Sequence, residues 1–272
     1  MKRNSWLPAA LFAILAIAVV ARVTPLGRVR ESNLTPDGAR FLNIARCMSR
    51  GEGFSTPEAW PAWLQPERLP APETFKEPLY PGAIAALTPI AGDPFRAAQW
   101  ISLIAGLLIP FIVIAFGRRL GMGVGTAVLA GLLAAVSPVL VQQSVLVMAE
   151  SLFTLVSLMA MLAAAPRPRA PGTDRSRRSE APDSAARANA LGMVAGIFFG
   201  LAFLVRAQAL LLLPALVALL VADRPPPVAL RRVLLAAAGT LAAIAPLVAR
   251  NLRVFGTPFH SDVAAFGLWP YT

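Results

Sequence analysis

Apolar runs recur along the chain and are separated by polar or charged stretches. A helix needs about twenty mostly apolar residues to cross the hydrocarbon of a bilayer. Two divisions, at Pro138 and Arg206, are inferred, because each lies in an apolar region too long for one span. The first run has the length at which a signal peptide and a first span overlap, and the further spans favour a retained helix. The pattern predicts about seven membrane-spanning helices, near residues 6–22, 97–116, 122–139, 144–165, 190–205, 208–222 and 233–249.

The basic residues predict the orientation of these spans, because short cytoplasmic loops are enriched in Lys and Arg. Most of them fall on one side of the predicted layout, whereas the short loops opposite contain only Arg206. We therefore expect a multi-pass protein of the inner (cell) membrane with its N-terminus in the cytoplasm. The residues on the predicted cytoplasmic side are Lys2, Arg3, Arg118, Arg119, Arg167, Arg169, Arg175, Arg177, Arg178, Arg187, Arg224, Arg231 and Arg232.

Two long connections interrupt the spans. Residues 23–96 form a long first outer loop in this layout, and long loops translocate largely regardless of their charge. Residues 166–189 are rich in Pro, Ser and Arg without an apolar period, which predicts a disordered cytoplasmic linker. The sequence contains no internal repeat of fixed period. We therefore treat residues 1–272 as a single transmembrane module of all-α fold class.

Composition narrows the classes of function. Hydrophobic residues make up 57% of the chain and charged residues only 14%, which is more apolar surface than one soluble core of this length hides. The net charge of +11 falls mostly between apolar runs, where orientation signals and membrane lipid headgroups explain it better than nucleic acid does. The single cysteine, Cys47, and the single histidine, His260, exclude an internal disulfide and a multi-histidine metal site.

An amphipathic helix is predicted in the first outer loop, in "TPDGARFLNIARCMSRGEGFS". Thr35 is a helix cap, Pro36 suits the first helical position, and Asp37 lies in the first turn, where a carboxylate is favoured. Such a helix lies in the membrane interface with its apolar face down. Asp37 either acts chemically there or only caps the helix. The apolar face comprises Phe41, Ile44, Ala45 and Met48, the polar face comprises Arg40, Asn43 and Arg46, and Gly51 and Gly53 end the helix.

Four further charged residues are candidates for a site. Lys76 and Glu77 precede the prolines of "FKEPLYPGAIAAL", a stiff turn leading back to the membrane, where they serve either a site or an interfacial anchor. Glu150 and Arg206 lie within apolar runs, where ionisable residues are costly and tend to be functional. The alternative for these two is that they pair with each other or extend towards water. In the predicted layout all four lie towards the outer side, as Asp37 does.

The chain resembles the membrane glycosyltransferases of the C-type fold, the group of the dolichyl-phosphate-mannose protein mannosyltransferases and the bacterial aminoarabinose transferases. The resemblance lies in five short motifs that follow one another in order along nearly the whole chain. Members of the group continue with more spans, so the resemblance implies the N-terminal part of that fold. The motifs are "PDGARFLNIARCMSRGEGF", "KEPLYP", "MAESLFTL", "GIFFGLAFLVRAQALLLLP" and "ARNLRVFGTPF".

The resemblance implies transfer of a sugar from a polyprenyl-phosphate donor to a lipid, glycan or protein acceptor outside the cytoplasm, with inversion at the anomeric carbon. Asp37 matches the first-loop aspartate of the group and Lys76 the lysine of its proline turn. Many relatives have a second acidic residue where Gly38 stands, and many read "KPP" where Glu77 intervenes. No cofactor is certain, and a divalent metal near the first-loop acidic residues, as in some relatives, is an open alternative.

These residues supply what the chemistry needs. A hydroxyl that attacks a sugar carbon benefits from a carboxylate base, and a departing lipid phosphate needs cations. We expect Asp37 to be the base and Lys76, Arg206 and Arg250 to bind the donor phosphate. Glu77 and Glu150 are then supporting residues. Two other classes of protein remain as alternatives: a transporter or flippase of lipid-linked intermediates, and a membrane assembly subunit without catalytic activity.

Overall fold

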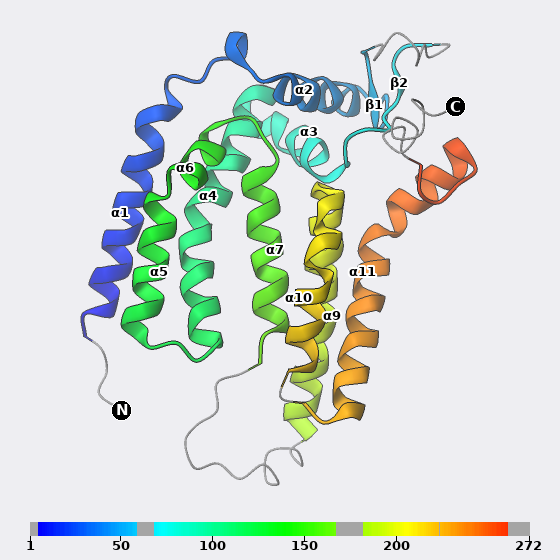
Figure 1. Cartoon of the computed structure of the whole chain (residues 1–272). Coiled ribbons are helices and arrows are strands. Elements are labelled where there is room, and N and C mark those ends of the chain that lie inside the picture. Colours follow the sequence, from blue (N-terminus) through cyan, green and yellow to red (C-terminus); the bar gives the residue numbers. More distant parts are fainter. Residues whose placement is uncertain (1–4, 59–67, 167–181, 223, 261–272) are drawn as a thin grey trace, which may run out of the picture.

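The structure is a computed structural model that describes residues 5–58, 68–166, 182–222 and 224–260. Most of these residues are helical (Figure 1). The elements in chain order are α1 (Leu7–Leu26), the 3₁₀ helix η1 (Glu31–Asn33), α2 (Pro36–Ser49), β1 (Ser55–Thr56), β2 (Ala71–Pro72), α3 (Leu79–Ala91), α4 (Pro94–Arg119), α5 (Val124–Val136), α6 (Pro138–Val145), α7 (Glu150–Ala164), α9 (Pro182–Val205), the 3₁₀ helix η2 (Ala207–Leu212), α10 (Leu213–Val221) and α11 (Pro226–Phe255).

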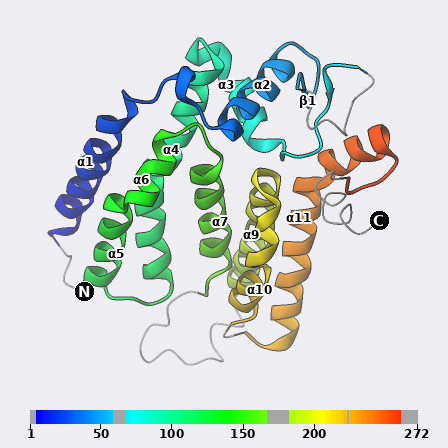
Figure 2. The same cartoon turned by 45° about the horizontal axis from the view of Figure 1, so that its top comes forward.

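The long helices stand side by side, and the first loop lies across one end of them. Helix α1 packs on α5, α5 on α4, α4 on α7, α7 on α9, and α9 on α11. Helices α2 and α3 and the short antiparallel pair β1–β2 cover the same end of this row (Figure 2). The predicted all-α class therefore holds apart from this two-stranded sheet. We call the covered end the loop end of the bundle.

The structure contains fewer long apolar helices than the sequence predicts. Three helices in the described part of the chain, α1, α4 and α11, are long and apolar enough to cross a membrane. A fourth candidate is the pair α5 and α6, which is bent by 53° at a break where Ser137 precedes Pro138. Helices α3 and α7, the described apolar part of α9, and η2 with α10 are apolar but shorter. The chain is thus a membrane-associated helical protein, and the seven-span layout is not confirmed.

Several predicted boundaries need correction. The predicted span 144–165 is a continuous α-helix only from Glu150 to Ala164, because α6 ends at Val145 and residues 146–149 are not helical. Helix α9 begins at Pro182, so the predicted disordered stretch 166–189 is helical in its last part, and residues 167–181 lie outside the described residues. The predicted span 208–222 is divided into a 3₁₀ turn and the short helix α10.

Glycines set the close packing of α9 against α11. Gly192, Gly196 and Gly200 are spaced by four residues, which places them on one face of α9. At each of them an added Cβ would meet the backbone of α11, at Gly192 the carbonyl oxygen of Arg232 at 3.0 Å. Thr240 of α11 also donates a hydrogen bond to the carbonyl of Gly196 (3.0 Å). This contact fixes α9 and α11 relative to each other, and with them Arg206, which follows α9, and Arg250 of α11.

Arginines bind carbonyls at the end of the bundle opposite to the loop end. Arg119 donates to the carbonyl of Ala165 (3.3 Å), and Arg232 donates to those of Ala164 (3.1 Å) and Leu220 (2.9 Å). The last carbonyls of a helix have no partner within the helix, and they favour cations. These arginines therefore stabilise the C-terminal ends of α7 and α10.

Candidate functional site

Helix α2 forms as the sequence predicts and positions Asp37. The Thr35 hydroxyl accepts the Gly38 N–H (3.1 Å), Pro36 is the first helical residue, and the chain leaves the helix through Gly51, whose φ is +80°. Phe41 and Ala45 of the apolar face are buried in a core shared with neighbouring helices. The capping hydrogen bond therefore comes from Thr35, which leaves the Asp37 side chain available for other contacts.

Arg40, which the sequence assigns to the polar face of α2, is buried. Arg40 is only 6% exposed and Glu73 only 1% exposed. The Arg40 guanidinium forms a bidentate ion pair with the Glu73 carboxylate. The Nη2 to Oε1 distance is 2.8 Å and the Nε to Oε2 distance 3.1 Å. A charge can be buried at tolerable cost when it is paired and hydrogen-bonded in this way. Neither residue stood out in the sequence, because the partner lies 33 positions away.

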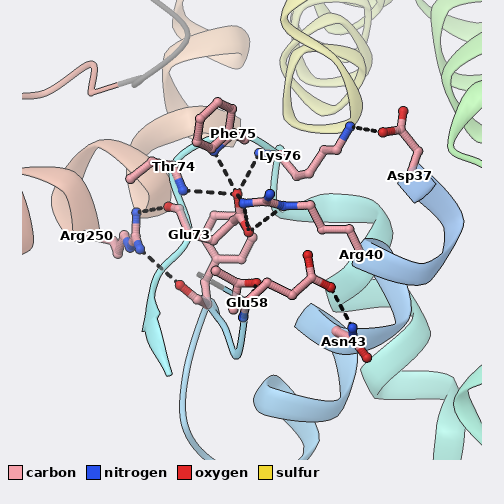
Figure 3. A network of polar contacts seen from close by, with 11 residues as sticks. Asp37, Arg40, Asn43, Glu58, Glu73, Thr74, Phe75, Lys76 and Arg250 are labelled. Atoms are coloured by element: carbon pink, nitrogen blue, oxygen red, sulfur yellow. Dashed lines mark hydrogen bonds and ion pairs between the residues drawn. The ribbon is translucent and has the colours of Figure 1, made fainter. Parts of the chain in front are cut away.

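Glu73 organises the turn that carries Lys76. Its Oε1 atom accepts the backbone N–H groups of Thr74 (3.1 Å), Phe75 (2.7 Å) and Lys76 (3.1 Å), so one buried carboxylate holds three consecutive peptide groups (Figure 3). The Arg40 guanidinium also faces the Phe75 ring. The pair of Arg40 with Glu73 thereby fastens this turn to α2, which carries Asp37.

The turn brings Lys76 to Asp37, its partner from the other end of the first loop. The Lys76 Nζ atom donates to the Asp37 Oδ1 atom at 2.8 Å across 39 positions of sequence (Figure 3). The Asp37 side chain is 43% exposed and that of Lys76 19% exposed. Within the part of the chain that the structure describes, Asp37 Oδ2 has no hydrogen-bond partner. One carboxylate oxygen thus holds the lysine, and the other has no partner among the described residues.

Glu77, the residue after Lys76, connects this pair to a second one. Its Oε1 atom accepts the Ala207 N–H (2.7 Å), and the preceding residue, Arg206, forms an ion pair with Glu150 (2.9 Å). The predicted alternative that Glu150 and Arg206 pair with each other is therefore confirmed, because their side chains form this ion pair. Burial raises the pKa of the Glu77 carboxyl above its ordinary value, although the Ala207 N–H and the Arg206 charge act in the opposite direction. Five predicted site residues are thus connected by neighbouring contacts, which we call the chain of contacts from Asp37 to Arg206. They are Asp37, Lys76, Glu77, Arg206 and Glu150.

Glu150 retains an unsatisfied group. Among the described residues its Oε2 atom is buried and has no hydrogen-bond partner, and the same is true of the neighbouring hydroxyl of Ser151. Buried polar atoms are nearly always hydrogen-bonded, and exceptions are found at functional sites. Helix α7 therefore presents unused hydrogen-bonding capacity beside Arg206.

The structure places Arg250 elsewhere in the loop end. Its guanidinium donates to the carbonyls of Glu73 (3.0 Å) and Phe54 (3.0 Å) and lies over the Phe54 ring. It thus holds the two sides of the β1–β2 region to α11, next to the Glu73 turn but outside the chain of contacts from Asp37 to Arg206 (Figure 3). Its binding to a donor phosphate stays a prediction.

The backbone at Gly38 lies too close to another segment to admit a side chain, so a second acidic residue does not fit after Asp37. A Cβ atom at this position would lie 2.8 Å from the Val147 carbonyl oxygen, in the linker that leads into α7. The linker is itself held in place, because Ser102 donates to the Met148 carbonyl (3.2 Å) and shares a hydrogen bond with Tyr80 (3.0 Å). Only glycine permits this approach of α2 to the start of α7.

We expect Gly38→Ala to destabilise the protein by about 1–3 kcal/mol, because the added methyl group must displace the Val147 carbonyl. The matched control is Gly125→Ala in α5, where nothing lies within 4 Å of the added atom and a helical alanine is favoured. Unfolding by SDS in mixed micelles measures both. A Gly38→Ala protein as stable as Gly125→Ala would show that the two segments are not in contact.

No group of three or more His, Cys, Asp and Glu side chains that could hold an ion is found in residues 5–58, 68–166, 182–222 and 224–260. Asp37 Oδ1, the first candidate ligand, is occupied by the Lys76 ammonium. The chemistry considered below therefore relies on charged side chains.

These contacts define a membrane-associated helical protein with a cluster of paired charges at one end of its bundle. Comparison with protein-family models, with curated proteins and with solved structures finds no match for the chain. The functional argument therefore depends on the geometry of this cluster and on the motifs of the sequence.

Proposed function

We propose that the chain is a glycosyltransferase of the C-type fold that transfers a sugar from a polyprenyl phosphate to an acceptor at the outer face of the inner membrane. The observation that carries the proposal is the contact between Lys76 and Asp37. A cation and a carboxylate from the two ends of one loop meet at the loop end of the bundle. The proposal includes the seven-span layout, with a cytoplasmic N-terminus.

The proposed reaction uses Asp37 as a general base. The hydroxyl oxygen of the acceptor bonds to the anomeric carbon of the sugar and gives its proton to Asp37 Oδ2. The bond between the anomeric carbon and the phosphate oxygen breaks, and its electron pair leaves with the polyprenyl phosphate. Attack from the side opposite to the leaving group inverts the configuration. A positioned carboxylate lowers the barrier for the proton transfer, and fixed cations stabilise the charge that develops on the phosphate.

Lys76 and Arg206 are the proposed phosphate-binding cations. Each is paired with a carboxylate, Asp37 or Glu150, and neither pair is fully buried. A phosphate group that binds Lys76 competes with Asp37 for the ammonium group. Binding of the donor would thus free Asp37 for the acceptor, which couples the two substrates. Glu77 supports this arrangement through its hydrogen bond to the Ala207 N–H, which fixes the turn beside Arg206.

A membrane location suits such a donor. The prenyl chain is as apolar as lipid and remains in the hydrocarbon, whereas the sugar and the phosphate belong at the interface. Helix α2 carries Asp37 at one end of apolar helices that include three candidate spans. A carboxylate and two cations at that depth meet the polar end of a lipid-linked sugar.

Loss of either cation should weaken use of the donor. We expect Lys76→Ala and Arg206→Ala to lower kcat/KM for the donor about 10- to 150-fold, the effect of losing one charge-assisted hydrogen bond. Lys76→Arg should retain part of the activity because its charge remains. The matched control is Arg253→Ala, which removes an exposed arginine from the last turn of α11. Normal kinetics in both alanine variants would remove these cations from the site.

A second candidate function is favoured by the pairing itself. Asp37, Lys76, Glu150 and Arg206 all have partners, as in a membrane assembly subunit whose charges only hold its loop in place. Incubation of purified protein with a polyprenyl-phosphate sugar radiolabelled in the sugar distinguishes the candidates. A transferase moves the label to an acceptor, whereas an assembly subunit or a flippase leaves it on the lipid.

A further inference from the structure

A groove lies in the half of the bundle away from the loop end, between α4, α7 and α9. Its volume is about 540 Å³, and eight of the ten residues that line it are apolar, among them Ala115, Leu162 and Val194. The two others are arginines, Arg118 and Arg119, both in the last turn of α4. The groove is thus apolar along its walls and positively charged at one end.

The groove is short enough to fit within one leaflet of a bilayer. On α4 its lining extends from Ile112 to Arg119 and on α9 from Leu191 to Phe198, each about 10 Å along the helix. Half of the hydrocarbon core is about 15 Å thick. Helix α4 is long and apolar enough to cross a membrane, and it ends at these arginines. In such a span the apolar walls would lie at the depth of acyl chains and the guanidinium groups at the depth of headgroups.

The positive charges of the lining favour an anionic ligand. None of the ten lining residues is acidic. Arg118 also donates to the Met122 carbonyl (2.5 Å) and Arg119 to that of Ala165 (3.3 Å), so backbone contacts fix where both guanidinium groups stand. A phosphate diester that is the only charge of its headgroup complements this basic end of the groove, whereas a zwitterionic headgroup brings a cation of its own towards the arginines.

We propose that this groove binds one anionic glycerophospholipid, with an acyl chain along the apolar walls and the phosphate at Arg118 and Arg119. The site is distinct from the loop end. It is also independent of the proposed sugar transfer, because none of its residues belongs to the chain of contacts from Asp37 to Arg206. Bound lipid would bridge α4, α7 and α9 at the end where the first loop does not connect them.

Native mass spectrometry of the full chain tests the proposal, with equal amounts of phosphatidylglycerol and phosphatidylcholine of the same acyl chains. We expect one retained phosphatidylglycerol per chain and a preference of about tenfold or more over phosphatidylcholine. Arg118→Gln should reduce that preference by most of this factor. Ala115→Phe should displace the lipid by filling the groove. The matched control is Arg231→Gln, which removes an exposed arginine from the same end of the bundle without touching the lining.

Each alternative has its own outcome. Equal retention of the two lipids would overturn the proposal, as would an equal effect of Arg231→Gln, which indicates a diffuse attraction to surface charge. Retained phosphatidylglycerol that survives Ala115→Phe in well-folded protein would place the lipid elsewhere. Displacement of phosphatidylglycerol by equimolar polyprenyl phosphate would assign the groove to the donor lipid and contradict a phospholipid site.

Discussion

Asp37→Asn should lower the rate of sugar transfer to a hydroxyl acceptor by about two to four orders of magnitude, the contribution of a positioned general base. Asparagine has nearly the same shape, and its amide oxygen still accepts a hydrogen bond from Lys76. The helix cap does not depend on Asp37, because Thr35 supplies it. The variant loses an ion pair whose aspartate is 43% exposed, which costs under about 1 kcal/mol. We therefore expect a folded protein that binds donor but transfers its sugar slowly.

Asp93→Asn is the matched control for this experiment. Asp93 caps α4 by accepting the Arg96 N–H (2.9 Å), and asparagine retains that ability. The control therefore removes one exposed carboxylate charge at the N-terminus of a helix and keeps the cap. Its transfer rate should be close to that of the wild type. The acceptor must be a hydroxyl, since an ionised phosphate acceptor needs no base. Wild-type transfer by folded Asp37→Asn protein would show that Asp37 is not the base.

Glu73→Gln should destabilise the protein by about 3–5 kcal/mol, the largest effect on stability that we expect. The substitution removes the carboxylate charge of Glu73 from a buried ion pair with Arg40, and removing one partner of a buried ion pair is costly. The glutamine oxygen can still accept N–H groups from the following turn, so the loss reports mainly on the ion pair. SDS titration in mixed micelles measures the free energy of unfolding.

Two further variants separate the buried ion pair from surface charge. Arg40→Met combined with Glu73→Gln removes both charges and should recover at least half of the stability lost in Glu73→Gln. Glu31→Gln breaks the exposed ion pair with Arg46 and should cost under about 1 kcal/mol. If Glu73→Gln costs no more than Glu31→Gln, Glu73 does not hold the Lys76 turn in the way described.

Local signals in the sequence predicted the first-loop helix well. Its signals act through neighbouring residues, so they can be recognised in the amino-acid sequence alone. They are the cap at Thr35, the proline at the first position and the glycines after the helix. The number of membrane-spanning helices is harder to predict from the sequence. Apolar length alone does not distinguish a helix of twenty residues from a short helix joined to a linker or a 3₁₀ turn, which is how the stretches around Glu150 and Arg206 are built.

The sequence predicted the site as a set of residues, and of its ion pairs it predicted only that of Glu150 with Arg206, as one of two alternatives. Rarity of charge in apolar surroundings identified Glu150 and Arg206, and the family motifs identified Asp37 and Lys76. The burial of Arg40 was missed, because helical periodicity assigns a face but does not show that Glu73 covers it from a distant segment. The role of Gly38 was also hidden, since it depends on the Val147 carbonyl from another part of the chain.

The central claim is that the chain transfers a sugar covalently, and a doubly labelled donor tests it most directly. Purified protein in vesicles is given a polyprenyl-phosphate sugar with ³H in the sugar and ³²P in the phosphate, together with a hydroxyl acceptor. We predict that the two labels separate, with ³H in the acceptor and ³²P in the polyprenyl phosphate, and that separation is nearly lost in Asp37→Asn. Labels that stay together in one lipid, whichever leaflet it occupies, would contradict the claim.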